Sequence, residues 1–218
     1  MSDEIFQTAP DIAYGIILQK ILDGAYAPGT KLSLRKMAQA TNVSVIPVME
    51  ALNRLEESGL VESKPQWGSF VSVLTKEKVI QTVQLREAVE CQVARIMAQQ
   101  ITKQQADTLM EIATDLDTVP YDNTSADMSR NNHLRFHQGL AMYTGNELLV
   151  KTLERANLFW ILAQALVANA SNAEYPRYWH RKLMDDILSG DPDRAEKSMR
   201  EHVLDSLHPI LDELDRKK

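Results

Sequence analysis

The sequence predicts a mainly α-helical protein in two parts: three helices with a β-hairpin, followed by an all-α bundle of six to seven helices. Apolar residues recur at helical spacing through most of the chain. Aromatic residues make up only 6% of the 218 residues, while Leu, Ala, Met, Gln and Glu, which favour helices, are plentiful. Strand-like patterning is confined to one short stretch, so we expect the parts to span residues 1–75 and 76–218.

The first part has the order helix, helix, turn, helix, hairpin. This order is typical of a winged helix-turn-helix, whose last helix presents its N-terminal end to base edges in the major groove. The recognition helix would begin at Ser44, and the hairpin tip would be Gln66, Trp67 and Gly68. The expected elements are helices at 11–22, 33–40 and 46–58 and strands at 60–63 and 70–73.

The second part continues with amphipathic helical segments and shows no further strand pattern. A loop is expected at 119–124, and Gly190 with Pro192 predicts a tight turn between two helices. Thr75 is expected to cap the first helix of this part. The expected helices lie near 77–99, 102–117, 126–144, 146–169, 174–189 and 191–214.

Charge and cysteine content narrow the class of protein. The formal net charge of −6 argues against a protein that coats nucleic acid without specificity, although a specific DNA reader depends on local charge. Cys91 is the single cysteine, which fits a reducing cytoplasm. No apolar run approaches the roughly 20 residues of a membrane span, and the acidic start lacks a signal-peptide core. We therefore expect a cytoplasmic protein with no membrane partner.

Residues 34–38 and 42–61 resemble the GntR family of repressors. The string Pro-Val-x-Glu-Ala-Leu-x-x-Leu stands in the correct order with the turn and the hairpin. The resemblance implies a homodimer on a palindromic double-stranded DNA operator, with Arg35 as one DNA contact. Val45 and Met49 stand where the family usually carries arginines that contact the operator.

These substitutions change the expected base preference. Val45, Ile46 and Met49 are suited to contacting thymine methyl groups, which predicts an operator that leans towards A·T pairs. The alternative is that Val45 and Met49 pack inside the domain and Arg35 is a solvated surface charge.

Four of the five histidines form a pattern in the second part. His133 and His137 are four residues apart, so they share one helix face, while His180 and His202 lie on two later helices. Imidazoles converging from three helices would suit zinc, nickel or another transition ion. Spacing alone equally fits histidines that are satisfied at the surface or in the core, and His208 lies outside the pattern.

Residues 132–140 and 144–149 resemble the signature of the FCD domain, the helical sensor of the FadR branch, and the likeness covers roughly 78–212. It implies a divalent transition metal, zinc in the first place and nickel or manganese as alternatives, held by His133, His137, His180 and His202. His133 stands where the family usually has an aspartate. A fourth imidazole leaves the cation its full formal charge, which favours an anionic effector.

The FCD resemblance also implies that Arg86 grips the carboxylate of a small organic acid, because a guanidinium offers a bidentate fork. The alternative is an ion pair with Glu90, four residues on. We expect a ligand-responsive repressor rather than an enzyme. A metal-sensing repressor, with the ion itself as effector, stays open. A metal-dependent hydrolase is disfavoured because Leu134 stands where a His-Glu-x-x-His site has its general base.

Overall fold

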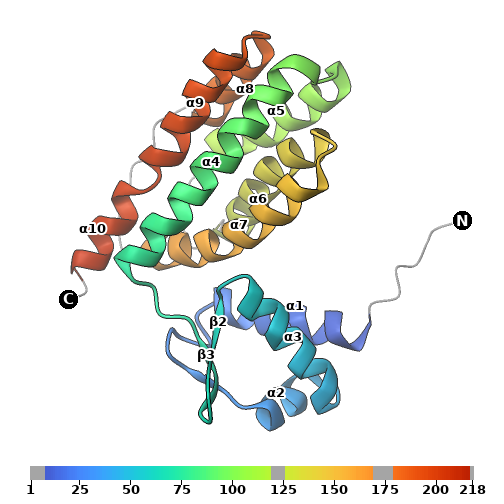
Figure 1. The fold of residues 1–218 in the computed structure, drawn as a ribbon, viewed down its shortest axis with the longest axis vertical. Helices are drawn as coiled ribbons and strands as arrows, with labels where there is room; N and C mark the ends of the chain where they lie inside the picture. Colours follow the sequence, from blue (N-terminus) through green and yellow to red (C-terminus); the bar gives the residue numbers. More distant parts are fainter. Residues whose placement is uncertain (1–7, 119–125, 169–178, 217–218) are drawn as a thin grey trace, which may run out of the picture. The chain divides into compact units, whose positions relative to one another are not determined.

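The computed structural model describes residues 8–118, 126–168 and 179–216. Its contacts divide the chain into two compact units, one ending at Leu74 and the other beginning at Thr75 (Figure 1). Each unit has its own apolar core and is described by itself. None of the described helices is both long and apolar enough to cross a membrane.

The first unit is a winged helix-turn-helix, as the sequence predicted. Its three helices pack against one another in all three pairs, and β3 is the central strand of a three-stranded antiparallel sheet in the order β1-β3-β2. Ile17, Ile21, Val48 and Leu55 are buried at its centre. The elements are α1 (Ala9–Leu22), β1 (Lys31–Leu32), α2 (Leu34–Thr41), α3 (Val45–Glu57), β2 (Val61–Lys64) and β3 (Gly68–Val71).

Two local features differ from the sequence expectation, which had no strand before the second helix and which placed Ser33 as the cap of that helix. The short strand β1 was not predicted, because two residues show no alternating pattern and the strand is defined by its pairing with β3, Lys31 with Phe70 and Leu32 with Ser69. Ser33 occupies the N-cap position of α2, but in the described chain its side chain makes no capping hydrogen bond. The turn between α2 and α3 is made by Asn42, which ends α2 in the left-handed conformation (φ 56°).

Two residues at the tip of the hairpin have left-handed backbone conformations. Lys64 lies opposite Gly68 in the β2–β3 pairing, and Gln66 (φ 66°) and Gly68 (φ 89°) both have positive φ. Trp67 lies between them at the tip. Its indole therefore projects from a tightly turned backbone, and 68% of its surface is exposed.

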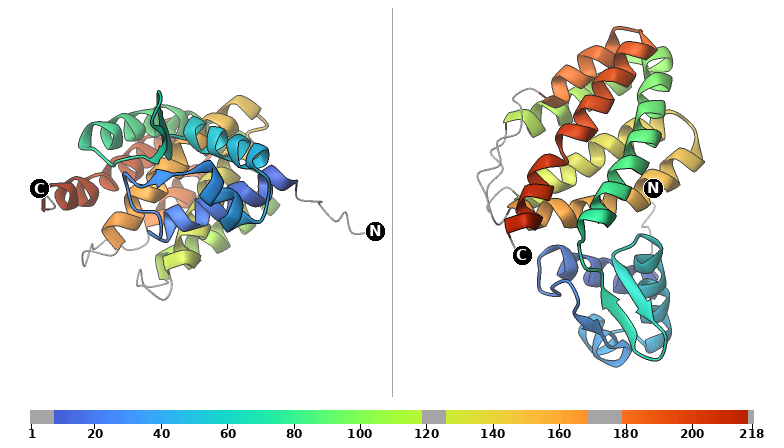
Figure 2. Two further views of the ribbon diagram at one scale, coloured as in Figure 1. Left: turned by 90° about the horizontal axis from the view of Figure 1, so that it is seen from below. Right: turned by 60° about the vertical axis from the view of Figure 1, so that its left-hand side comes forward.

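The second unit is an all-α bundle built around α4. This helix packs most extensively against α9 and α7, and also contacts α6 and α8. Figure 2 shows α4 and α9 side by side along the unit. The elements are α4 (Lys76–Gln100), α5 (Lys103–Thr118), α6 (Ala126–Tyr143), α7 (Glu147–Ala168), α8 (Trp179–Leu188), α9 (Pro192–Asp205) and α10 (His208–Arg216).

The ends of these helices follow ordinary capping chemistry. The Thr75 hydroxyl accepts a hydrogen bond from the Lys78 amide and so begins α4, as predicted. The single helix expected over 191–214 is two helices, α9 and α10. Pro209 lies in the first turn of α10, where its missing N–H and ring are tolerated, whereas it would interrupt a continuous helix.

Candidate metal centre and DNA-reading surface

The second unit brings the four predicted histidines together. His133 and His137 lie one turn apart on α6, His180 lies in the first turn of α8, and His202 lies in the last turn of α9. One candidate ligand atom from each residue lies within 4.8 Å of all the others. His137, His180 and His202 are buried, and His133 is half-buried. The bundle therefore gathers four imidazoles from three helices at one point.

The donor set of this cluster fits a transition ion. The Nε2 atoms of His202 and His137 are 3.3 Å apart. In the described part of the chain, the buried Nε2 of His180 has no hydrogen-bond partner. Buried ring nitrogens are normally satisfied, and neutral imidazole nitrogen is a preferred ligand of zinc and its neighbours. These nitrogens are therefore suited to hold a metal ion.

Two carboxylates each contact the Nδ1 atom of one histidine, which leaves the Nε2 atom of that ring for the cluster. Glu90 Oε2 pairs with His137 Nδ1, and Asp117 Oδ1 lies 2.9 Å from His180 Nδ1. Asp117 also accepts hydrogen bonds from the backbone N–H groups of His180 (3.1 Å) and Arg181 (3.0 Å). Both rings thus present Nε2 to the cluster, as metal-ligating histidines do when the other nitrogen is held by a carboxylate. Sequence reasoning missed both supports. Asp117 is 63 residues from His180, and the sequence pattern indicated Glu90 only as a partner of Arg86.

The electrostatics of the cluster keep three of its rings, those of His133, His180 and His202, in the ligand form. Burial lowers the pKa of His133 and His202 well below the ordinary value, and electrostatic repulsion of a protonated ring by the neighbouring histidines and Arg86 lowers it further. Burial also lowers the pKa of His180, although the hydrogen bond to Asp117 opposes this. At neutral pH these rings are uncharged, so their nitrogen lone pairs are free for a metal.

Arg86 lies beside this cluster, buried on α4. It is 1% exposed, its Nε donates to Glu90 Oε1 at 2.7 Å, and its guanidinium carbon is 4.8 Å from the centre of the Trp160 ring. Burial alone would raise the pKa of Glu90, but the charges of Arg86 and His137 outweigh it and lower the pKa to about 2. The ion pair with Glu90 therefore exists, but among the described residues one guanidinium nitrogen still has no partner.

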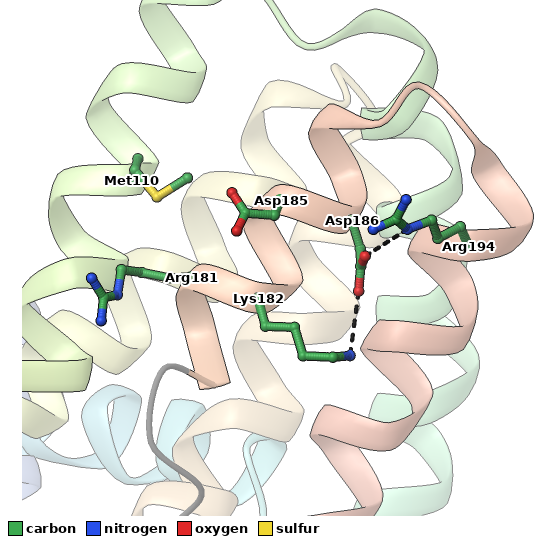
Figure 3. A pocket seen from close by; sticks show the side chains of 6 residues that line it. All are labelled: Met110, Arg181, Lys182, Asp185, Asp186 and Arg194. Atoms are coloured by element: carbon green, nitrogen blue, oxygen red, sulfur yellow. Dashed lines mark hydrogen bonds and ion pairs between the residues drawn. The ribbon is translucent and has the colours of Figure 1, made fainter.

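A second polar pocket of about 720 Å³ lies at the surface, where Met110 of α5 and Arg194 of α9 flank α8 (Figure 3). Asp186 at its wall pairs with Arg194 (2.7 Å) and Lys182 (3.3 Å). Arg181 in the same wall lies 3.5 Å from Asp117, the carboxylate that holds His180. Asp186 of α8 pairs with Lys182 of the same helix and with Arg194 of α9, so these charges join α8 to α9. Because these charges already pair with one another, the histidine cluster is the stronger candidate site.

In the first unit, the predicted DNA-reading residues lie at the surface. Val45, Ile46 and Met49 at the start of α3 are 45%, 65% and 46% exposed, so they do not form part of the core. Ser44, the N-cap residue of α3, is exposed. The remaining predicted contacts, all exposed, are Arg35, Gln66, Trp67 and Gly68.

Arg54 is a basic side chain of α3 whose contacts are with α1. Its Nη1 donates to Asp11 Oδ1 at 2.8 Å, and its guanidinium carbon lies 4.2 Å from the centre of the Tyr14 ring. Both partners belong to α1, so Arg54 joins α3 to α1.

Replacing Glu90 by glutamine is expected to weaken zinc binding by about 10- to 100-fold, the usual effect of losing a carboxylate that holds a ligating histidine. Glu90→Gln keeps the side-chain size but removes the charge that orients His137. Competition with a zinc-chelating dye measures the affinity.

The control for Glu90→Gln is Glu87→Gln, on the same helix, whose carboxylate pairs with Arg200. Equal zinc affinities for the two variants would show that Glu90 does not support a ligand.

Each of the two units matches the profile of a known protein family. Residues 11–71 match the profile described as "Bacterial regulatory proteins, gntR family", and residues 81–205 match "FCD domain". The HTH-type transcriptional repressor RspR of Escherichia coli (strain K12) is 30% identical over 193 residues, covering 87% of this chain and 83% of that protein.

Among solved structures, a GntR regulator from Rhodococcus sp. RHA1 (TM-score 0.72, 21% identity) covers 93% of this chain and 97% of its own. E. coli McbR/YncC (TM-score 0.76, 17% identity) covers 97% of this chain and 99% of its own, so both share the fold.

Proposed function

Because the chain belongs to the GntR family of bacterial regulatory proteins and carries an FCD domain, we propose that it is a repressor whose FCD domain binds a divalent metal and a small organic acid. It is a DNA-binding transcriptional regulator and not an enzyme. The observation that carries the proposed sensing role is the cluster of four imidazoles within 4.8 Å, with Arg86 beside it.

The metal would be held by His133, His137, His180 and His202. An all-nitrogen donor set favours zinc, with nickel next, whereas manganese prefers carboxylate oxygens. When bound, the cation supplies positive charge and Lewis acidity to a ligand. Four neutral imidazoles do not reduce the formal charge of the cation, so the site would favour an anionic effector over a neutral one.

Arg86 would bind the carboxylate of the organic acid. A buried guanidinium nitrogen without a partner, as found among the described residues, costs free energy that a carboxylate oxygen would recover. Glu90 keeps the guanidinium in place through Arg86 Nε, and among the described residues Nη1 has no partner, which leaves it for the ligand. The same Glu90 holds His137, so one carboxylate would position both the arginine and a metal ligand.

DNA would be read by α3 and the hairpin tip of a homodimer on a palindromic operator. Val45, Ile46 and Met49 are exposed apolar side chains, which supports contact with thymine methyl groups and an operator that leans towards A·T pairs. Arg35, Ser44 and the tip residues Gln66, Trp67 and Gly68 would contact the neighbouring backbone.

Regulation would follow from different affinities of the acid for DNA-bound and free protein. An alternative is that the metal ion itself is the effector. The burial of His137, His180 and His202 supports a retained ion, because enclosed ligands exchange a metal slowly. The organic acid is therefore the preferred signal.

The test uses an operator selected from a random DNA library by the purified full-length protein. Fluorescence anisotropy measures operator affinity with zinc alone, with C2–C6 carboxylic acids alone, and with both. We expect at least one acid to change the affinity about tenfold or more, in the zinc-loaded protein only, which corresponds to a coupling of about 1.4 kcal/mol. A response to zinc alone would support the metal-sensing alternative.

Arg86→Lys keeps the positive charge but loses the bidentate fork, so we expect it to abolish the response to the acid. Arg95→Lys is the control, because Arg95 lies on the same helix and pairs with Glu196 at 2.7 Å. An acid response that survives Arg86→Lys unchanged would remove Arg86 from the effector site.

A further inference from the structure

Helix α7 carries a second group of buried polar atoms. Asn157 is 3% exposed, and within the described part of the chain neither its Oδ1 nor its Nδ2 has a hydrogen-bond partner. Trp160 is 1% exposed, and its Nε1 is likewise without a partner there. The two residues are three apart on one helix, so their side chains share a face.

This group adjoins the proposed effector site. The Trp160 ring lies against the Arg86 guanidinium, with 4.8 Å between the ring centre and the guanidinium carbon. Arg86 donates to Glu90, and Glu90 pairs with His137 of the histidine cluster. A continuous series of contacts therefore runs from the metal ligands through Arg86 to Trp160, and Asn157 is one helical turn further.

The unpartnered atoms specify a chemistry. A buried polar atom without a partner is destabilising, and native proteins keep few of them. The indole N–H can only donate, whereas the amide offers both a donor and an acceptor. A carboxylate oxygen could not satisfy Oδ1 of Asn157, because it has no proton to donate. A hydroxyl group can donate to Oδ1 and accept from Trp160 Nε1 at the same time.

We propose that the effector is a hydroxylated carboxylic acid, whose carboxylate lies at Arg86 and whose hydroxyl group lies between Asn157 and Trp160. This inference rests on the proposed function, since it needs the acid to bind in the FCD domain. Asn157 is then the residue that selects the hydroxyl. A site built to hydrogen-bond a hydroxyl group rejects an analogue that lacks it, because its own polar atoms stay unpaired.

Isothermal titration of the zinc-loaded full-length protein with matched acids tests this proposal. The probes are butanoate and hexanoate, together with their mono- and polyhydroxylated counterparts at each chain position. For wild type we expect at least one hydroxylated acid to bind about 100-fold more tightly than its unsubstituted parent. In Asn157→Leu the advantage of the hydroxylated acid over its unsubstituted parent should fall to tenfold or less.

Thermal unfolding separates this role from a structural one. Without ligand, Asn157→Leu should unfold at or above the wild-type temperature, because an apolar side chain removes two unsatisfied buried atoms. Asn157→Asp is the second variant: its carboxylate keeps an acceptor but loses the donor, and it should repel the acid.

Acids that bind without any preference for the hydroxylated member would overturn the hydroxyl inference and leave the proposed function standing. A hydroxyl preference that persists in Asn157→Leu would also overturn it. If no acid of either kind binds the zinc-loaded protein, the proposed effector role itself fails and the inference fails with it.

Discussion

Saturating zinc is expected to raise the unfolding midpoint of this protein by on the order of 10 °C. A ligand that binds only the native state, at a thousand times its dissociation constant, stabilises by about 4 kcal/mol. For a unit of this size, 1 kcal/mol shifts the midpoint by about 2–4 °C. The four histidines come from three separate helices, so the unfolded chain does not hold the same donors together. Thermal unfolding followed by circular dichroism, with zinc and with excess chelator, measures the shift.

The chain offers a matched pair of histidines as the control. His202→Ala removes a buried member of the cluster and should lose most of the zinc-dependent shift. His208→Ala changes an exposed histidine at the start of α10, outside the cluster, and should keep the whole shift. The comparison uses the shift rather than the midpoint, so a destabilised zinc-free variant does not obscure the result. Equal shifts in both variants would contradict a metal at this cluster.

Replacing thymidine by deoxyuridine throughout the selected operator is expected to weaken binding on the order of a hundredfold. The substitution removes only the methyl groups of the bases, and each methyl contact is worth about 0.8 kcal/mol. With Val45 and Met49 each contacting one thymine in both half-sites, the four lost contacts give a factor on the order of a hundred. Fluorescence anisotropy with the two duplexes at one salt concentration measures it.

The double variant Val45→Arg, Met49→Arg tests the same contacts from the protein side. Arginine reads the O6 and N7 atoms of guanine, so library selection with this variant should enrich G·C pairs at the half-site centres. Its affinity should then depend little on the thymine methyl groups. Wild-type protein that binds the thymidine and deoxyuridine duplexes equally would show that the exposed apolar side chains of α3 do not read methyl groups.

Local pattern determined much of this protein from the sequence alone. The apolar period of 3.6 residues located the helices, and the order of elements in 1–75 predicted a winged helix-turn-helix. The spacing of His133 and His137 placed them on one face of a helix, because helical geometry relates residues four apart. The resemblance to the GntR family implied that Val45 and Met49 are surface positions, with packing inside the domain as the alternative, and both side chains are exposed.

Only the tertiary structure showed which distant groups support the predicted elements and histidines. The strand β1 exists because Lys31 pairs with Phe70, and the support of His180 by Asp117 joins residues 63 positions apart. Within the described residues, the atoms of Asn157 and Trp160 that lack partners could not be found from the sequence pattern either, because a buried amide and an exposed one have the same sequence letter. Periodicity reports which face of an element is apolar, whereas hydrogen-bond satisfaction depends on what the folded chain places opposite each polar atom.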